Sequence, residues 1–242
     1  MVQGVIKVIG LGTLINCGGI ILGGAAGFLF GKHMPERVRD GLNMACGITV
    51  LFIGISGAME QMLLVGGKSM FIVICIVLGT LAGELINIEG LFERFGEWLK
   101  AKTGNAKDKD FVNAFVTASL TVCIGAMAIV GAIEDGMKGD FSILATKAVL
   151  DLIIIIVMSC TMGKGCVFSV IPVFVFEGAI TLLAKLIAPV VTEAAQANIS
   201  LIGSILIFCV GVNLVWGKKV RVANMLPSIL FAAGAAFLPF AF

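Results

Sequence analysis

KAVLDLIIIIVMS, residues 147–159, is an apolar run that nevertheless contains Lys147 and Asp151. A membrane-crossing helix needs about 20 mostly apolar residues, and the apolar sequence around this run extends over residues 141–162. A charge at the bilayer centre costs at least about 2.5–3.5 kcal/mol, so both charges must face the interior of a helix bundle or a water-filled cavity. The stretch therefore predicts a membrane helix with an inward-facing charge pair.

The composition of the whole chain supports this interpretation. Its 242 residues are 59% hydrophobic and 13% charged, with a mean hydropathy of +1.11. A soluble domain is about 45–50% apolar and about 25% charged. We predict an all-α polytopic membrane bundle that forms a single domain over residues 1–242. The bilayer and a small solute or ion are the expected partners, and the net charge of +2 without a basic patch predicts no nucleic-acid partner.

Eight segments are long enough to cross the bilayer. The first is too long for the apolar part of a secretory signal, which has about 7–15 residues, so we expect it to be retained. The segments are approximately residues 8–31, 42–65, 69–88, 112–134, 141–162, 166–188, 198–217 and 224–241.

The basic residues of the loops predict the orientation. Twelve Lys and Arg residues fall on one side and four on the other. Because cytoplasmic loops are enriched in Lys and Arg, both termini should lie outside. The twelve are Lys32, Arg37, Arg39, Arg94, Lys100, Lys102, Lys107, Lys109, Lys164, Lys218, Lys219 and Arg221; the four are Lys7, Lys68, Lys138 and Lys185.

Residues 88–100 form a different kind of segment, because their apolar side chains recur at helical spacing on one face only. We predict an amphipathic helix that lies in the cytoplasmic interface, with Trp98 as its anchor. A helix that packs on the protein's own loops is the alternative.

Four glycines in the first segment are spaced four residues apart: Gly19, Gly23, Gly27 and Gly31. Glycines on one helical face let two helices approach closely in lipid. They predict tight packing against another helix of the chain or against a second subunit, so a homodimer is possible.

Asp151 is near the middle of its segment, and Lys147 is one turn away on the same face. The pair either holds two helices together or forms part of a solute or ion pathway. Glu177 favours the pathway, because it lies at similar depth and follows Pro172 and precedes Gly178. Pro172 and Gly178 favour a bent or interrupted helix, which is where transporters commonly bind substrate. The short connection at 163–165 makes the two segments neighbours, so Lys147, Asp151 and Glu177 could meet.

Other polar residues have weaker predicted roles. Glu84, about one turn from the cytoplasmic end of its segment, either lines the pathway or extends toward the interface. The acids expected at a solvated outer rim are Glu60, Glu134 and Asp135, and the amides expected to join helices are Asn16 and Asn213.

The motifs exclude several functions. Seven cysteines without C-x-x-C and a single histidine, His33, predict neither a disulfide framework nor a metal site. No nucleophile elbow, H-E-x-x-H or Walker sequence occurs, so we expect no enzyme activity and no cofactor. Any transport would then be passive or ion-coupled. We predict a secondary transporter with Asp151, Lys147, Glu177 and Glu84 in its pathway. Three acids against one base there favour a cation or amine. A channel and a structural or regulatory membrane subunit are the alternatives.

The run CIGAMAIVGAIEDGMKGDFSILATKAVLD (123–151), with GTLINCGGIILGGAAG near the start and VFEGAITLLA (175–184), resembles the YqgA/YdfK-like bacterial inner-membrane proteins of unknown function. The resemblance covers essentially the whole chain. It implies a bacterial cytoplasmic-membrane protein, sometimes described as a transporter, and it assigns no substrate or site residue. We expect an amide at the position of Glu177 in relatives, which makes Asp151 the more secure candidate.

Overall fold

The computed structural model describes residues 9–31, 33–65, 69–189 and 191–237. Lys7, Lys32 and Lys68, which were counted for the orientation, lie outside these residues. The regular elements of the described part are all helical. They are α1 (Leu11–Gly31), α2 (Glu36–Val65), α3 (Ser69–Ile86), α4 (Ile88–Lys102), α5 (Phe111–Cys123), α6 (Ala126–Lys138), α7 (Ser142–Met162), the 3-10 helix η1 (Lys164–Ser169), α8 (Val170–Leu182), α9 (Ala184–Ile187), α10 (Glu193–Trp216), α11 (Val222–Met225) and α12 (Pro227–Ala235).

The predicted all-α membrane bundle is confirmed, with fewer spans than the eight expected. Among the described residues, six stretches are long and apolar enough to cross a membrane: α1, α2, α3, α7, η1 with α8, and α10. α5 and α6 would make a seventh span if they are taken together, although the chain bends by 62° between them. The segment expected at 224–241 instead contains the short helices α11 and α12, and its residues 238–241 lie outside the described part.

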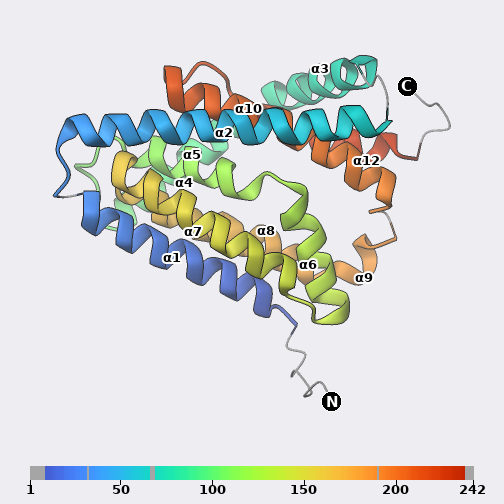
Figure 1. Ribbon diagram of the computed structural model, residues 1–242, viewed down its shortest axis with the longest axis horizontal. Coiled ribbons are helices and arrows are strands. Elements are labelled where there is room, and N and C mark those ends of the chain that lie inside the picture. Colours follow the sequence, from blue (N-terminus) through green and yellow to red (C-terminus); the bar gives the residue numbers. More distant parts are fainter. Residues whose placement is uncertain (1–8, 32, 66–68, 190, 238–242) are drawn as a thin grey trace.

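Two helix pairs form opposite sides of the bundle (Figure 1). α1 packs along α7 on one side and α2 packs along α10 on the other, while α5 lies between them. α5 is central because its small and aromatic residues fill the interior: Phe111, Ala114, Phe115 and Ala118 are all fully buried. α3 lies outside α10 and packs on α11 and α12.

The glycines of α1 explain why α1 and α7 lie so close. A Cβ atom at Gly19 would be 2.9 Å from the carbonyl oxygen of Ala148, and one at Gly23 would be 2.7 Å from that of Leu152. Gly27 and Gly31 face Ile156 and Cys160 in the same way. Each step of four residues along α1 thus matches a step of four residues in the same direction along α7. The two helices therefore run parallel, as predicted for these segments.

This packing also bears on the possible homodimer. The glycine face of α1 is covered by α7 of the same chain. It is therefore not available to a second copy, and the homodimer prediction loses the observation on which it was based.

The segment at 88–100 is helix α4, and it has two faces. Glu89, Gly96 and Leu99 are buried where the helix packs against α5 and α11. On the other face, exposed apolar side chains recur at Leu91, Phe95 and Trp98, and the last two rings stack with centroids 5.7 Å apart. The helix thus packs on its own protein and also presents the apolar stripe that an interfacial position requires.

The α1–α7 packing predicts a position-specific cost of adding a methyl group. Gly23→Ala should destabilise the protein by about 1–3 kcal/mol, because overpacking a tight interface forces the backbones apart. Gly18→Ala is the control, since a Cβ there meets nothing within 4 Å. Thermal unfolding in detergent checks this, and equal stability of the two variants would contradict the close packing.

Candidate functional site

The structure brings Lys147, Asp151 and Glu177 together inside the bundle. The Lys147 ammonium forms an ion pair with Asp151 one turn along α7, and its Nζ lies 3.5 Å from Oε1 of Glu177 on α8. It also donates a hydrogen bond of 2.8 Å to the carbonyl oxygen of Val122. The exposed fractions of the three residues are 6%, 5% and 1%. An ammonium group has three hydrogens, and three acceptors surround this one.

The Val122 carbonyl is available because the helix is broken. In a continuous α-helix this oxygen would accept a hydrogen bond from the amide four residues on. α5 instead ends at Cys123, and the backbone turns at Gly125, whose φ of 154° is a conformation that side-chain-bearing residues rarely adopt. The sequence had predicted one continuous segment over residues 112–134, without this break. An isolated glycine within the apolar segment 112–134 was the signal that could have indicated it.

Asn16 of α1 is the fourth member of the cluster. Its Nδ2 donates a hydrogen bond of 2.8 Å to Glu177 Oε1, and its side chain is fully buried. The predicted role of Asn16 as an amide that joins helices fits this contact. Because Gly19 brings α1 against α7, the short Asn16 side chain reaches the charge cluster.

The irregular backbone predicted around Pro172 and Gly178 lies somewhat earlier in the chain. The 3-10 helix η1 ends at Ser169, and α8 begins at Val170 and continues through Gly178 to Leu182. Pro172 is therefore in the first turn of α8, where a missing amide hydrogen costs little. Glu177 projects from a regular helical turn.

Two acids lie elsewhere than expected. Glu84 is exposed and pairs with Arg221 at 2.7 Å, so it does not join the charge cluster. Asp135 was predicted at a solvated rim and is instead fully buried, where its Oδ2 accepts the Gly12 backbone N–H at 3.0 Å. The rim prediction failed because α6 turns this face toward α1 and α8.

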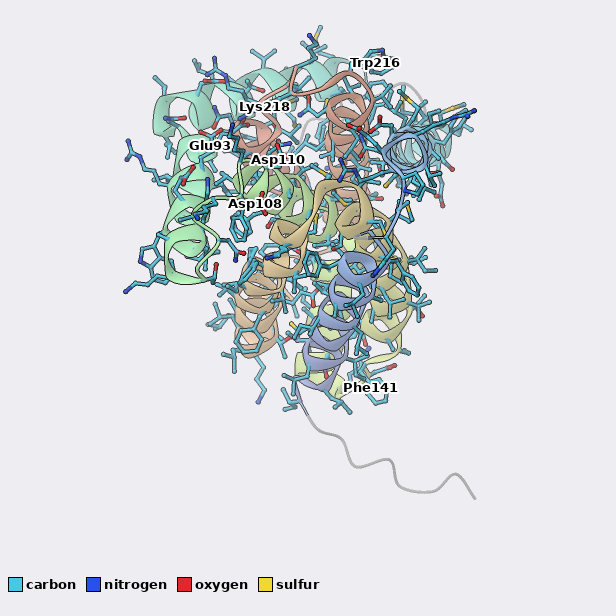
Figure 2. All side chains as sticks on the ribbon, turned by 90° about the vertical axis from the view of Figure 1, so that its left-hand side faces the viewer. Glu93, Asp108, Asp110, Phe141, Trp216 and Lys218 are labelled. Carbon is cyan, nitrogen blue, oxygen red and sulfur yellow. The ribbon has the colours of Figure 1, made fainter. Side chains whose placement is uncertain are left out.

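A polar cavity of about 1540 Å³, here called the vestibule, opens at the end of the bundle where α1 and α7 finish. Figure 2 looks onto this end, with Glu93 and Lys218 near Asp108 and Asp110. Its lining includes the predicted cytoplasmic cations Arg39, Arg94, Lys109 and Lys218.

Lys218 bridges two acids of α4 at the vestibule. Its Nζ lies 2.6 Å from Glu89 and 2.5 Å from Glu93. Partial burial lowers the pKa of Lys218, but hydrogen bonds and charge attraction from the two carboxylates raise it by more, so the pKa lies above its ordinary 10.5. The bridge fastens the loop before α11 to α4.

Lys147, Asp151 and Glu177 are not among the residues that line the vestibule. Ser159 lines the vestibule and is two turns from Asp151 on α7, a distance of about 12 Å along the axis. Ile155 lies between them on the same face and is fully buried. The cluster is therefore closed to the vestibule in this conformation.

Comparison with known proteins places the chain in a family. A family described as "Protein of unknown function (DUF554)" matches residues 11–237. The chain belongs to this family. Two relatives are each 29% identical to this chain. One is the "Uncharacterized membrane protein YdfK" of Bacillus subtilis, over 96% of this chain and 97% of the relative, and the other is the "Uncharacterized protein YqgA" of Escherichia coli, over 92% and 94%. No solved structure matches this chain. It is thus a multi-pass membrane protein, as the resemblance implied.

The charge cluster of this DUF554 protein predicts an asymmetric effect on stability. Lys147→Met leaves two buried carboxylates without their cation and should cost about 3–5 kcal/mol. Lys147→Met/Asp151→Leu should recover much of the loss, because only one carboxylate then remains. Unfolding by SDS in mixed micelles measures both variants, and wild-type stability of Lys147→Met would contradict the account.

The Lys218 bridge predicts a pH dependence in alkali. Because the folded-state pKa is raised above 10.5, the stabilisation is fully present below pH 10.5 and is lost as the pH rises through the raised value. Thermal unfolding of wild type and Lys218→Met, followed across this range, should therefore converge at high pH. A difference that stays constant would contradict the bridge.

Proposed function

We propose that this protein is an ion-coupled secondary transporter of a small cation or amine, with Asp151 and Glu177 as the binding carboxylates. The observation that carries the proposal is the set of acceptors around the Lys147 ammonium: two carboxylates and the free Val122 carbonyl. Oxygen ligands of this kind suit a monovalent cation or an alkylammonium group as well as they suit lysine. Lys147 would act as a tethered cation that the substrate displaces.

The position of the cluster supports this function. Asp151 is the tenth of the 21 residues of α7 and thus lies near its middle. Charged groups inside a membrane bundle are costly and commonly mark ion or substrate pathways. Transporters commonly build such sites where a helix is interrupted and its free carbonyls face the ion. The break after Cys123 leaves the Val122 carbonyl without a helical partner in this way.

The proposed cycle requires access from either side in turn. In the present conformation Ile155 separates the cluster from the vestibule. Displacement of Ile155 would open the site to the vestibule, which faces the cytoplasm in the predicted orientation. We propose a bacterial cytoplasmic membrane as the location, with both termini outside.

A structural role is the second candidate, because the Lys147 ammonium donates to Val122 and Asp151 and also pairs with Glu177. In that role the cluster would only hold α5, α7 and α8 together. It predicts that neutralising the charges changes stability and no flux.

Solid-supported-membrane currents from the protein in liposomes test the proposal. We expect a current with at least one of protons, Na⁺, K⁺ or small primary amines, with small anions as the comparison. Asp151→Asn should abolish it, because the site loses one of its carboxylates. Glu60→Gln is the matched control, since it neutralises an exposed acid.

Two outcomes would count against the proposal. One is silence across the whole panel from folded wild-type protein. The other is an undiminished current from folded Asp151→Asn, which would place the flux outside the cluster.

A further inference from the structure

A row of buried polar side chains continues from the charge cluster away from the vestibule. After Asn16 and Glu177 come the hydroxyls of Thr13 and Thr181, whose oxygens lie 3.5 Å apart, and then Asp135. The exposed fraction of each of these five residues is 4% or less. They lie on the three facing helices α1, α8 and α6.

Helical spacing aligns the row. Thr13 and Asn16 are three residues apart on α1, and Glu177 and Thr181 are four apart on α8, so each pair occupies one face. Asp135 joins the end of the row through its hydrogen bond to the amide of Gly12, the neighbour of Thr13.

The row ends near the surface at the end of the bundle where α1 begins. Asp135 is three residues before Lys138, the last residue of α6, whose side chain is 62% exposed. Figure 1 shows the start of α1 and the end of α6 near each other at the lower edge of the bundle, away from the end of α7 at the left. The row therefore spans the distance between this surface and the middle of the bundle.

Three oxygens of the row accept no hydrogen bond from any described residue. They are Asp135 Oδ1, Asn16 Oδ1 and Glu177 Oε2. Leaving a buried polar atom unsatisfied costs about 1–3 kcal/mol, so such atoms ordinarily bind water or a proton. Two of the three belong to carboxylates, one at each end of the row.

The surrounding charges leave Asp135 as the proton acceptor of this end. In the described part, Glu134 and Lys138 of its own helix pair with each other at the surface, and no ion pair includes Asp135. α1 carries no charged residue. The charged groups on the other helices packed against α6 are Lys147 and Asp151 on α7, Glu177 on α8, Lys185 on α9 and Glu193 on α10.

We propose that this row conducts protons between the bundle end at Asp135 and Glu177, so the coupling ion of the transport proposed above is the proton. The inference rests on that proposed function and specifies it. Asp135 takes up a proton on its free Oδ1. Each threonine hydroxyl, with bridging water, accepts one proton and releases its own. The proton arrives on Oε2 of Glu177, which becomes neutral and weakens its hold on Lys147.

Proton uptake into liposomes tests the row. The protein is reconstituted with pyranine trapped inside and with a cation or amine that gives a current present on both sides, and a potassium gradient with valinomycin makes the interior negative. Asp135→Asn keeps an acceptor for the Gly12 amide but cannot ionise. It should slow uptake at least about tenfold, in line with the contribution of a positioned proton-transfer group. Glu134→Gln, the adjacent surface acid, is the control and should match wild type.

Thr13→Val/Thr181→Val is the second variant, because it keeps the side-chain shapes and removes both hydroxyls. It should slow uptake in the same way, and it carries the test if Asp135→Asn does not fold. Wild-type uptake in either folded variant would overturn the row and leave the proposed transporter standing. Wild-type protein that gives currents with Na⁺ or amines but takes up no protons would do the same. Silence with every ion would overturn both.

Discussion

The burial of one ammonium between two carboxylates is the interaction on which the rest of this structure depends. Lys147, Asp151 and Glu177 are nearly inaccessible, and unpaired charges at that depth would oppose membrane insertion. With all three ionised, the cluster keeps one negative charge that no lysine neutralises. Backbone and amide groups must therefore contribute, and the fold supplies the Val122 carbonyl as acceptor and the Asn16 amide as donor.

Each of these contributions requires a glycine elsewhere. The turn at Gly125 frees the Val122 carbonyl, because it ends α5 before the next helical hydrogen bond forms. The glycines of α1 allow that helix to touch the α7 backbone, which brings Asn16 within reach of Glu177. Gly125 and the glycines of α1 therefore serve helix packing and also provide the polar contacts of the buried charges.

The sequence predicted the cluster better than the backbone around it. Helical spacing and a three-residue connection sufficed to bring Lys147, Asp151 and Glu177 together, since both depend only on local geometry. The break at Gly125 had only one weak local signal, a glycine within an apolar segment. The burial of Asp135 depends on how α6 turns after α5, which no local pattern encodes. The bent helix predicted at Pro172 differs from the structure for a related reason. Proline disrupts a helix interior but is tolerated in the first turn, and the place of Pro172 in the helix follows from where η1 ends.

The chain uses a lysine between two acids twice, with different physical consequences. Lys218 between Glu89 and Glu93 is half exposed at the vestibule, so solvent screens part of the attraction even though Glu89 is buried. Lys147 lies in a part of the bundle that excludes solvent, where any change in its partners alters the balance of the whole cluster. A proton that arrives at Glu177 would change its contacts with Asn16 of α1 and Lys147 of α7, and would therefore affect α1, α7 and α8 together. The proposed coupling between an ion and a conformational change requires such sensitivity, and the unsatisfied Oε2 of Glu177 is the atom that would receive the proton.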